Sequence, residues 1–328
     1  MNHSQVVESV KECYEARLPL LITGAPGVGK SSAVRTAAAE LGIALIDVRA
    51  SQTDPVDWRG IPSIIDGRTR WCVPDFLPTS GSGILFLDEL TAAPMAVQVA
   101  LYQLILDRRI GDYTLPDGWY VLGAGNRVED RAAAGRMSTA LNNRLVHLEM
   151  VADVDGWLEW YWQTGLPEEV AFFIGFRREL LFRFDPSSRE AAFPTPRSWE
   201  AAAKLYARGL STALEAPLIT GAIGNGAAME LLAFCKIYKE LPSIDGILMD
   251  PERAIVPTEP SAVAATVAAL AKKASPASIG SIMKYLSRLI KEYEFLGMKL
   301  SRRFNPAIET TRDCAAWMQK HSKYMCAA

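Results

Sequence analysis

The first residues with a recognisable chemical pattern have the spacing G-x-x-x-x-G-K-S and are Gly24, Ala25, Pro26, Gly27, Val28, Gly29, Lys30 and Ser31. Glycines let the backbone curl so that its N–H groups face an anion, and the start of a following helix adds to that attraction. The lysine supplies a point positive charge, and the serine hydroxyl is a hard ligand for Mg²⁺. The spacing therefore predicts a phosphate-binding loop of the nucleotide-binding kind, to which we add Ser32.

Two adjacent carboxylates, Asp88 and Glu89, follow the apolar run at residues 84–87. Ligands of open α/β sheets bind beyond the carboxyl ends of the strands, so a buried strand would deliver both groups to that edge. We expect Asp88 to hold Mg²⁺, directly or through water, and Glu89 to polarise an attacking water. A small-molecule kinase needs no carboxylate for activating water, so the pair favours a nucleotide-hydrolysing motor.

Apolar runs and helical patterns alternate over the first 150 residues. The patterns predict strands at residues 18–23, 44–48, 84–87, 119–123 and 145–150, and helices at 6–14, 31–41 and 95–107. Strands that alternate with helices indicate a parallel sheet covered on both faces. The predicted fold class is α/β with a doubly wound parallel sheet.

Strand signals fade after about residue 151, and helical patterns follow one another. We expect helices at 157–163, 168–182, 198–208 and 227–239, and one over 279–295 among the two or three that close the chain. A stretch with Pro and Asp residues, 241–260, indicates a mostly irregular connector. The second half of the chain is therefore expected to be helical.

The composition limits the possible classes of protein. With 328 residues, of which 49% are apolar and 22% charged, the chain suits two or three globular units. The net charge of −2, without a basic stripe, argues against a nucleic-acid partner. Five dispersed cysteines without a C-x-x-C pair, and three scattered histidines, disfavour a zinc site and indicate a reducing compartment.

The N-terminal pattern and the apolar runs bear on location. Residues 1–10 lack the basic and apolar segments of a signal peptide. The longest apolar run near the C-terminus, 262–271, is too short to cross a bilayer. We therefore predict a cytoplasmic protein with no membrane span.

The motifs over residues 18–199 together resemble the MoxR-like, dynein-related group of AAA+ ATPases. Besides the two motifs above, the resemblance rests on a D-x-x-G turn and hairpin within 57–78, a helix and hairpin within 92–110, and a strand with a polar end at 123–127. Trp58 and Trp71 lie in the first of these stretches, and Trp119 follows the second hairpin. We expect all three to pack locally instead of touching a substrate or a neighbouring subunit.

The resemblance implies roles for single residues. Asn126 matches the sensor asparagine, which orients water near the γ-phosphate. Arg144 matches the arginine that reaches the γ-phosphate of a neighbouring subunit, although a leucine follows it where the group usually has an aromatic residue; Arg131 and Arg136 are competing candidates. Arg197, after a proline that opens a helix, matches the second sensor, which couples loss of the γ-phosphate to rotation of the lid.

The resemblance also implies an organisation and an activity. It implies an AAA+ nucleotide-binding domain over 1–150 with an insertion near 55–78, a helical lid over 151–240, and a C-terminal helical extension over 241–328. The implied ligands are ATP and Mg²⁺, with Ser31 and Asp88 on the metal. The implied catalytic residues are Lys30, Glu89, Asn126, Arg144 and Arg197.

The implied function is ATP hydrolysis by a homo-oligomer, expected to be a hexamer, that remodels or assembles a protein partner like a chaperone. In this group the partner often bears a von Willebrand factor A domain. Two alternatives stay open. A basic pore or DNA-stimulated hydrolysis would favour a DNA-directed motor or replication accessory. The second alternative is a nucleotide-gated scaffold that barely hydrolyses ATP. Glu89 argues against it, because such a scaffold does not need a residue that activates water.

Overall fold

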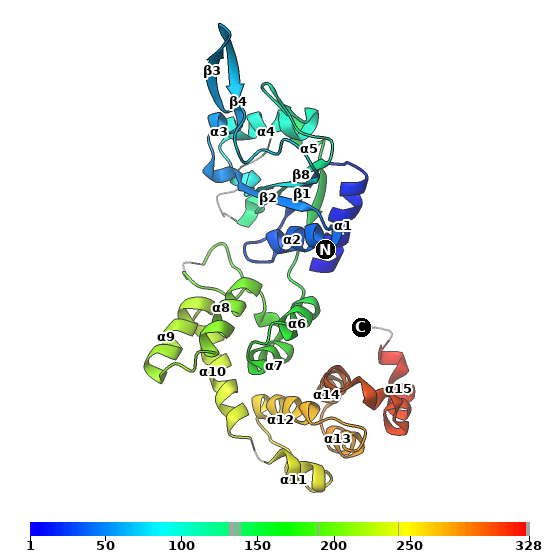
Figure 1. Ribbon diagram of the computed structural model, residues 1–328. Helices are drawn as coiled ribbons and strands as arrows, with labels where there is room; N and C mark the ends of the chain where they lie inside the picture. Colours follow the sequence, from blue (N-terminus) through cyan, green and yellow to red (C-terminus); the bar gives the residue numbers. More distant parts are fainter. Residues whose placement is uncertain (131–134, 136, 138, 189, 242, 326–328) are drawn as a thin grey trace. The chain divides into compact units, whose positions relative to one another are not determined.

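The computed structural model describes residues 1–130, 135, 137, 139–188, 190–241 and 243–325 (Figure 1). The chain forms two compact units. The first comprises Met1–Trp160 and Glu179–Ala202, and the second comprises Tyr161–Arg178 and Ala203–Ala328. Each unit has its own hydrophobic core.

The first unit contains a parallel sheet of five strands in the order β2-β5-β8-β1-β9. Its strands are β1 (Leu20–Thr23), β2 (Ala44–Arg49), β5 (Gly83–Asp88), β8 (Trp119–Gly125) and β9 (Val146–Glu149). Strand β1 lies between β8 and β9, so Ile22 pairs with Ala124 on one side and with Leu148 on the other. The predicted α/β class and all five predicted strands are confirmed.

Helices cover both faces of this sheet (Figure 1). Ile22 packs with α1 (His3–Glu15) and α2 (Lys30–Leu41), whereas the next-door Leu21 packs on the opposite face with α4 (Met95–Asp107). Successive side chains of a strand point to opposite faces, and both faces are buried here. This is why the strands are continuous apolar runs in the sequence.

An excursion between β2 and β5 corresponds to the predicted insertion. It contains η1 (Ala50–Gln52), α3 (Pro55–Arg59) and a two-stranded hairpin of β3 (Ile61–Ile65) and β4 (Arg68–Cys72). The two residues of its turn, Asp66 and Gly67, both have positive φ (52° and 70°), as a type I′ turn requires. After β5 come η2 (Leu90–Ala92) and, beyond α4, a second hairpin of β6 (Arg109–Ile110) and β7 (Tyr113–Thr114).

The tryptophans of these segments differ in exposure. Trp58 is fully buried and donates a 2.8 Å hydrogen bond to Thr53 Oγ1. Trp119 is also buried and donates to the Ser80 carbonyl at 2.9 Å. Trp71 on β4, in contrast, is 38% exposed. Local packing is confirmed for Trp58 and Trp119 but holds only in part for Trp71, because a two-stranded hairpin has no core of its own.

Short helical elements complete the first unit and lead into the second. They are η3 (Val128–Asp130), α5 (Thr139–Asn142), α6 (Val154–Trp162), η4 (Arg178–Leu180) and α8 (Pro196–Tyr206). Helices α6 and α8 each continue across the division between the units.

The second unit is entirely helical in its described part, as predicted. Its further elements are α7 (Glu168–Phe176), α9 (Thr212–Ile223), α10 (Asn225–Lys239), α11 (Ile244–Met249), α12 (Pro260–Lys272), α13 (Ile279–Leu286), α14 (Lys291–Phe304), η5 (Pro306–Thr310) and α15 (Arg312–Met325).

Two predicted helices in this region were wrong in extent. The helix expected over 168–182 ends at Phe176, whereas the expected connector 241–260 is mostly irregular as predicted and contains only the short helix α11. The helix expected over 279–295 is instead two helices, α13 and α14, with a break between them. Ile282 of α13 and Met298 of α14 are both buried in one hydrophobic core. The division of this region into a lid and an extension stays a prediction.

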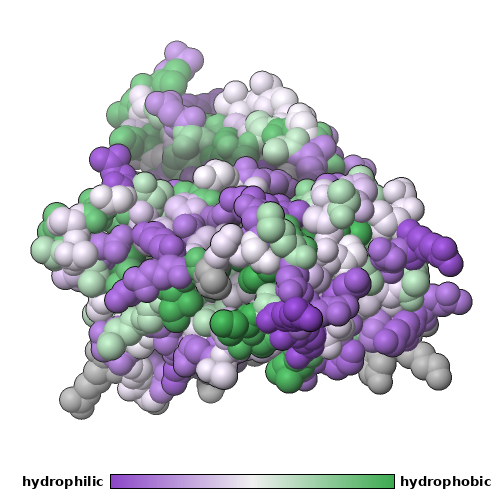
Figure 2. Space-filling view, turned by 90° about the horizontal axis from the view of Figure 1, so that it is seen from below, coloured by the Kyte–Doolittle hydropathy of each residue, from purple (hydrophilic) through white to green (hydrophobic). Residues whose placement is uncertain are grey.

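None of the helices in the described ranges is long and hydrophobic enough for a bilayer crossing. On the face drawn in Figure 2, hydrophobic residues lie interspersed with hydrophilic ones.

Candidate functional site

The predicted phosphate loop connects β1 to α2, and its backbone conformation and close packing require glycine at several positions. Gly27 and Gly29 have φ values of 79° and 105°, in the left-handed region that favours glycine. A Cβ on Gly27 would lie 2.7 Å from Thr195 Oγ1, and one on Gly24 would lie 2.5 Å from the Met150 carbonyl oxygen. The loop is therefore tightly enclosed by neighbouring chain segments.

The remaining loop residues divide between the core and the surface. Ala25 and Val28 are buried with the residues of α1 and α2. Pro26 is partly buried, and Ser32 is exposed on α2. The apolar residues thus anchor the loop, while its backbone is held at the edge formed by the carboxyl ends of the strands.

Lys30, the first residue of α2, is buried at this edge. Its Nζ donates hydrogen bonds to the carbonyl oxygens of Gly24 (2.8 Å) and Ala25 (3.0 Å) and to Asn126 Oδ1 (3.0 Å). The ammonium therefore links the phosphate loop to the end of β8. Two of the predicted site residues, Lys30 and Asn126, are in direct contact.

Burial lowers the pKa of Lys30 from 10.5 to about 8, although Asp88 and Asp130 act in the opposite direction. The charged form, which attracts a polyphosphate, predominates below this pKa and is lost above it. We therefore expect the affinity for ATP to fall about tenfold per pH unit once the pH exceeds the pKa. Nucleotide titrations from about pH 7 to about pH 9.5 would measure this decline.

The Lys30→Arg variant is the control for this pH profile, because a guanidinium stays charged over the whole range. Its affinity, whatever its absolute value, should not depend on pH in this interval. A wild-type profile as flat as that of the variant would contradict the assignment of Lys30.

The two carboxylates at the end of β5 point to different neighbours. Asp88 Oδ2 accepts a 2.7 Å hydrogen bond from Ser31 Oγ, and Asp88 Oδ1 accepts one from the Glu89 N–H at 2.9 Å. Glu89 adopts a left-handed conformation (φ 56°), which is uncommon for a residue with a Cβ. Its carboxylate accepts a hydrogen bond from Ser51 Oγ in η1. Ser51 is a site residue that the sequence did not predict.

The donor set beside the phosphate loop fits Mg²⁺. Ser31 Oγ and Asp88 Oδ2 are hard oxygen ligands that already lie together. No group of three or more His, Cys, Asp or Glu residues within the described ranges could enclose a metal ion. Mg²⁺ suits such a sparse set, because it usually keeps several waters and takes phosphate oxygens as further ligands.

Asn126 directly follows β8, and the strand end is fixed by a residue from η2. Thr91 Oγ1 donates to the Asn126 carbonyl at 3.1 Å. A Cβ on Gly125 would lie 2.1 Å from the same hydroxyl oxygen, so only glycine allows this approach. The next residue, Arg127, pairs with the buried Asp130 at 2.8 Å. Both contacts hold the backbone on which the Asn126 side chain depends.

Arg197 reaches the same region through the start of α8. Thr195 caps this helix by accepting from the Ser198 N–H at 3.1 Å, and it also encloses Gly27. The Arg197 side chain is exposed, and its charge contributes to the lowered pKa of Lys30. The sequence missed Thr195, because its contact with the phosphate loop joins residues far apart in the chain.

Arg144 lies on the surface and has different contacts from the group around Lys30. It follows α5, and its guanidinium donates to the Tyr102 hydroxyl and lies 5.7 Å from the ring centre of that residue on α4. The competing candidates Arg131 and Arg136 lie outside the described residues. The structure thus brings together Lys30, Ser31, Asp88, Glu89, Asn126 and Arg197. Arg144 is not in this group and contacts Tyr102 instead.

Comparison with known proteins identifies part of the chain. Residues 19–145 match the AAA domain of the dynein-related subfamily, so this segment, which begins at β1 and ends just after Arg144, is an AAA domain with the P-loop fold. No curated protein shows significant sequence similarity to the chain.

Comparison with solved structures finds chains of low sequence identity. NtrX from Brucella abortus is 15% identical, with a TM-score of 0.44 over 92% of this chain and 67% of that one. A RuvB mutant from Thermotoga maritima is 19% identical, with a TM-score of 0.43 over 89% of this chain and 85% of that one.

Proposed function

We propose that the AAA domain at residues 19–145 binds ATP with Mg²⁺ and hydrolyses it to ADP and phosphate. The observation that carries the proposal is the group formed by Lys30, Ser31, Asp88 and Glu89 at one edge of the sheet. These residues come from the end of one strand and the start of one helix, and their chemistry matches that of phosphoryl transfer to water.

The loop and Lys30 would bind the phosphates. The N–H groups around Gly27 and Gly29 and the start of α2 attract the anion. The Lys30 ammonium bonds to two loop carbonyls and to Asn126. It would exchange the carbonyl contacts for β- and γ-phosphate oxygens, which are stronger acceptors because they are charged.

Glu89 would be the general base. Its carboxylate takes a proton from water as the water oxygen forms a bond to the γ-phosphorus. The bond from that phosphorus to the β,γ-bridging oxygen breaks, and the electron pair leaves with ADP. Asn126 would orient the water, and Ser51 would orient Glu89 by its hydrogen bond. Mg²⁺, held by Ser31 and Asp88, would offset the negative charge that develops on the phosphate oxygens.

The proposal extends to a MoxR-like homo-oligomer, most simply a hexamer in the cytoplasm, that remodels or assembles a protein partner. Proteins with a von Willebrand factor A domain are the first partners to test. The position of Arg144 supports the oligomer. Arg144 is exposed and contacts Tyr102, and it is not among the residues grouped around Lys30, so we expect it to serve the site of a neighbouring subunit. Arg197 would sense the γ-phosphate within the same subunit.

Arg144→Ala should retain ATP binding and lose hydrolysis by about a thousandfold, because an arginine finger stabilises the charge of the transition state. Glu89→Gln should also be inactive, through loss of the base. An equimolar mixture should recover part of the turnover, since a Glu89→Gln subunit can offer its arginine to an Arg144→Ala subunit that keeps its glutamate. Phosphate release by the mixture measures this recovery.

Two controls make the mixing experiment specific. Mixing Arg144→Ala with the doubly substituted Glu89→Gln, Arg144→Ala chain should restore nothing. Arg109→Ala, which removes another exposed arginine, should keep wild-type turnover. If the first mixture also stays inactive while both variants bind ATP, Arg144 does not act on a neighbouring subunit.

A further inference from the structure

The hairpin formed by β3 and β4 is unusually exposed for an apolar segment. Ile61 and Ile64 are 71% and 81% exposed, and Trp71 is 38% exposed. A hairpin of two strands is only marginally stable in water unless a third strand or a helix packs against it. Figure 1 shows it extending away from the sheet. Its apolar side chains therefore suit burial against another surface.

The hairpin is also basic. Arg68 and Arg70 lie on the same face of β4, because side chains two apart in a strand point the same way. Both are exposed, and within the described part of the chain neither side chain takes part in an ion pair or hydrogen bond. Asp66 in the turn is the one acidic residue of the hairpin. A surface that receives the hairpin should accordingly be acidic and partly apolar.

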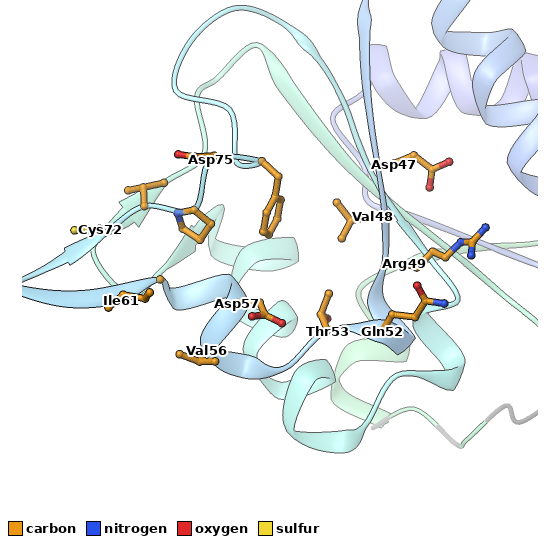
Figure 3. A pocket seen from close by; sticks show the side chains of 14 residues that line it. Asp47, Val48, Arg49, Gln52, Thr53, Val56, Asp57, Ile61, Cys72 and Asp75 are labelled. Atoms are coloured by element: carbon orange, nitrogen blue, oxygen red, sulfur yellow. The ribbon is translucent and has the colours of Figure 1, made fainter.

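A groove with these properties lies in the same unit, beside β2 (Figure 3). Its volume is about 1090 Å³, which exceeds the roughly 300–1,000 Å³ of most small-molecule pockets. Apolar side chains line it, among them Val48, Val56 and Phe76. β2 is an edge strand that, among the described residues, pairs with β5 alone, so a further extended segment could pair with the other side of its backbone.

The charges at the groove complement those of the hairpin. Asp57 and Asp75 line it on the side of α3 and β4. The side chains of Asp47 and Arg49 extend to the far side of β2 in Figure 3, and Asp47 is paired there with Arg35 at 3.1 Å. The carboxylates facing the groove are thus not neutralised by the one basic residue that lines it.

We propose that the β3–β4 hairpin of one copy of this chain docks into the groove of a second copy. A hairpin cannot enter the groove of its own subunit, because its base residues, Ile61 and Cys72, form one wall of that groove. The contact joins two different surfaces of identical chains, and such a head-to-tail contact generates a ring when it closes. The inference rests on the proposed oligomer and adds a specific interface to it.

Charge reversal tests the contact. Arg70→Asp places an acidic hairpin against an acidic groove, and Asp75→Arg removes a negative charge from the groove and places a positive one there against a basic hairpin. Each variant alone should need at least about tenfold more protein than wild type for half-assembly, measured by mass in solution with ATP and Mg²⁺. Asp75 makes no hydrogen bond or ion pair in the described part of the chain, so its replacement should leave the fold intact.

The decisive sample is an equimolar mixture of the two variants. In an alternating arrangement, the acidic hairpin of each Arg70→Asp chain meets the positive charge introduced into the groove of an Asp75→Arg chain. The unaltered basic hairpin of each Asp75→Arg chain meets the unaltered acidic groove of an Arg70→Asp chain, so every contact is favourable. The mixture should therefore assemble at concentrations where either variant alone does not. Arg253→Asp, the same change of charge at an exposed position of the other unit, should assemble like wild type.

Four results would separate the possibilities. Recovery in the mixture supports the contact. Wild-type assembly by both single variants overturns it, and so does failure of the mixture when both variants bind ATP normally, since another partner would then occupy the groove or the hairpin. A wild-type chain that binds ATP but never assembles would overturn the proposed ring itself. If only the hairpin contact were refuted, the proposals of ATP hydrolysis and of Arg144 acting on a neighbouring subunit would still stand.

Discussion

Replacing Lys30 with alanine should lower the affinity for ATP by about a hundredfold or more, because a charge-assisted contact to the phosphates is lost in a buried place. The substitution also leaves three acceptors without their donor: the carbonyls of Gly24 and Ala25 and the side-chain oxygen of Asn126. Titration with a fluorescent ATP analogue measures the affinity.

The matched control is Lys11→Ala. Lys11 is a lysine of α1 that pairs with Glu8 and Glu40, each at 2.7 Å, so its loss removes the same charge at another position. It should bind ATP like wild type. A thermal melt establishes that Lys30→Ala is folded, and folded Lys30→Ala with normal affinity would refute the phosphate-loop assignment.

Glu89→Gln should bind ATP about as well as wild type but turn it over about 10²–10⁴-fold more slowly, because an amide cannot accept the proton of the attacking water. The glutamine has the same shape, and its side-chain oxygen can still accept the hydrogen bond from Ser51. Phosphate release under saturating ATP, together with the binding titration, separates the two effects.

Glu129→Gln is the control for this substitution, since Glu129 is a well-exposed carboxylate on η3. Its turnover should equal that of wild type. If Glu89→Gln released phosphate at an unchanged rate, the chain would have no need of this carboxylate, and a nucleotide-gated scaffold would become the better interpretation.

Local patterns in the sequence were sufficient for much of the fold. Buried parallel strands produce apolar runs, so all five strands could be located before the order β2-β5-β8-β1-β9 was known. The phosphate loop and Asp88 with Glu89 could likewise be found, because each motif lies within a few consecutive residues. Their convergence follows from topology, since the carboxyl ends of parallel strands meet at one edge.

Contacts between distant segments could not be predicted. Ser51 reaches Glu89, Thr91 fixes the end of β8, and Thr195 encloses Gly27. Serines and threonines are common in turns and caps, so their sequence context gives no sign of these partners. The break between α13 and α14 was missed for a similar reason, because packing in the helical core, not local propensity, determines it.

The most direct test of the proposed ATP-driven ring is the mass of the Glu89→Gln protein in solution, measured with and without ATP and Mg²⁺. We predict a hexamer's mass that appears only with ATP, since the variant binds the nucleotide without consuming it. A monomer or dimer under every condition, at concentrations where ATP binding is saturated, would contradict the ring and leave Arg144 without a neighbouring active site.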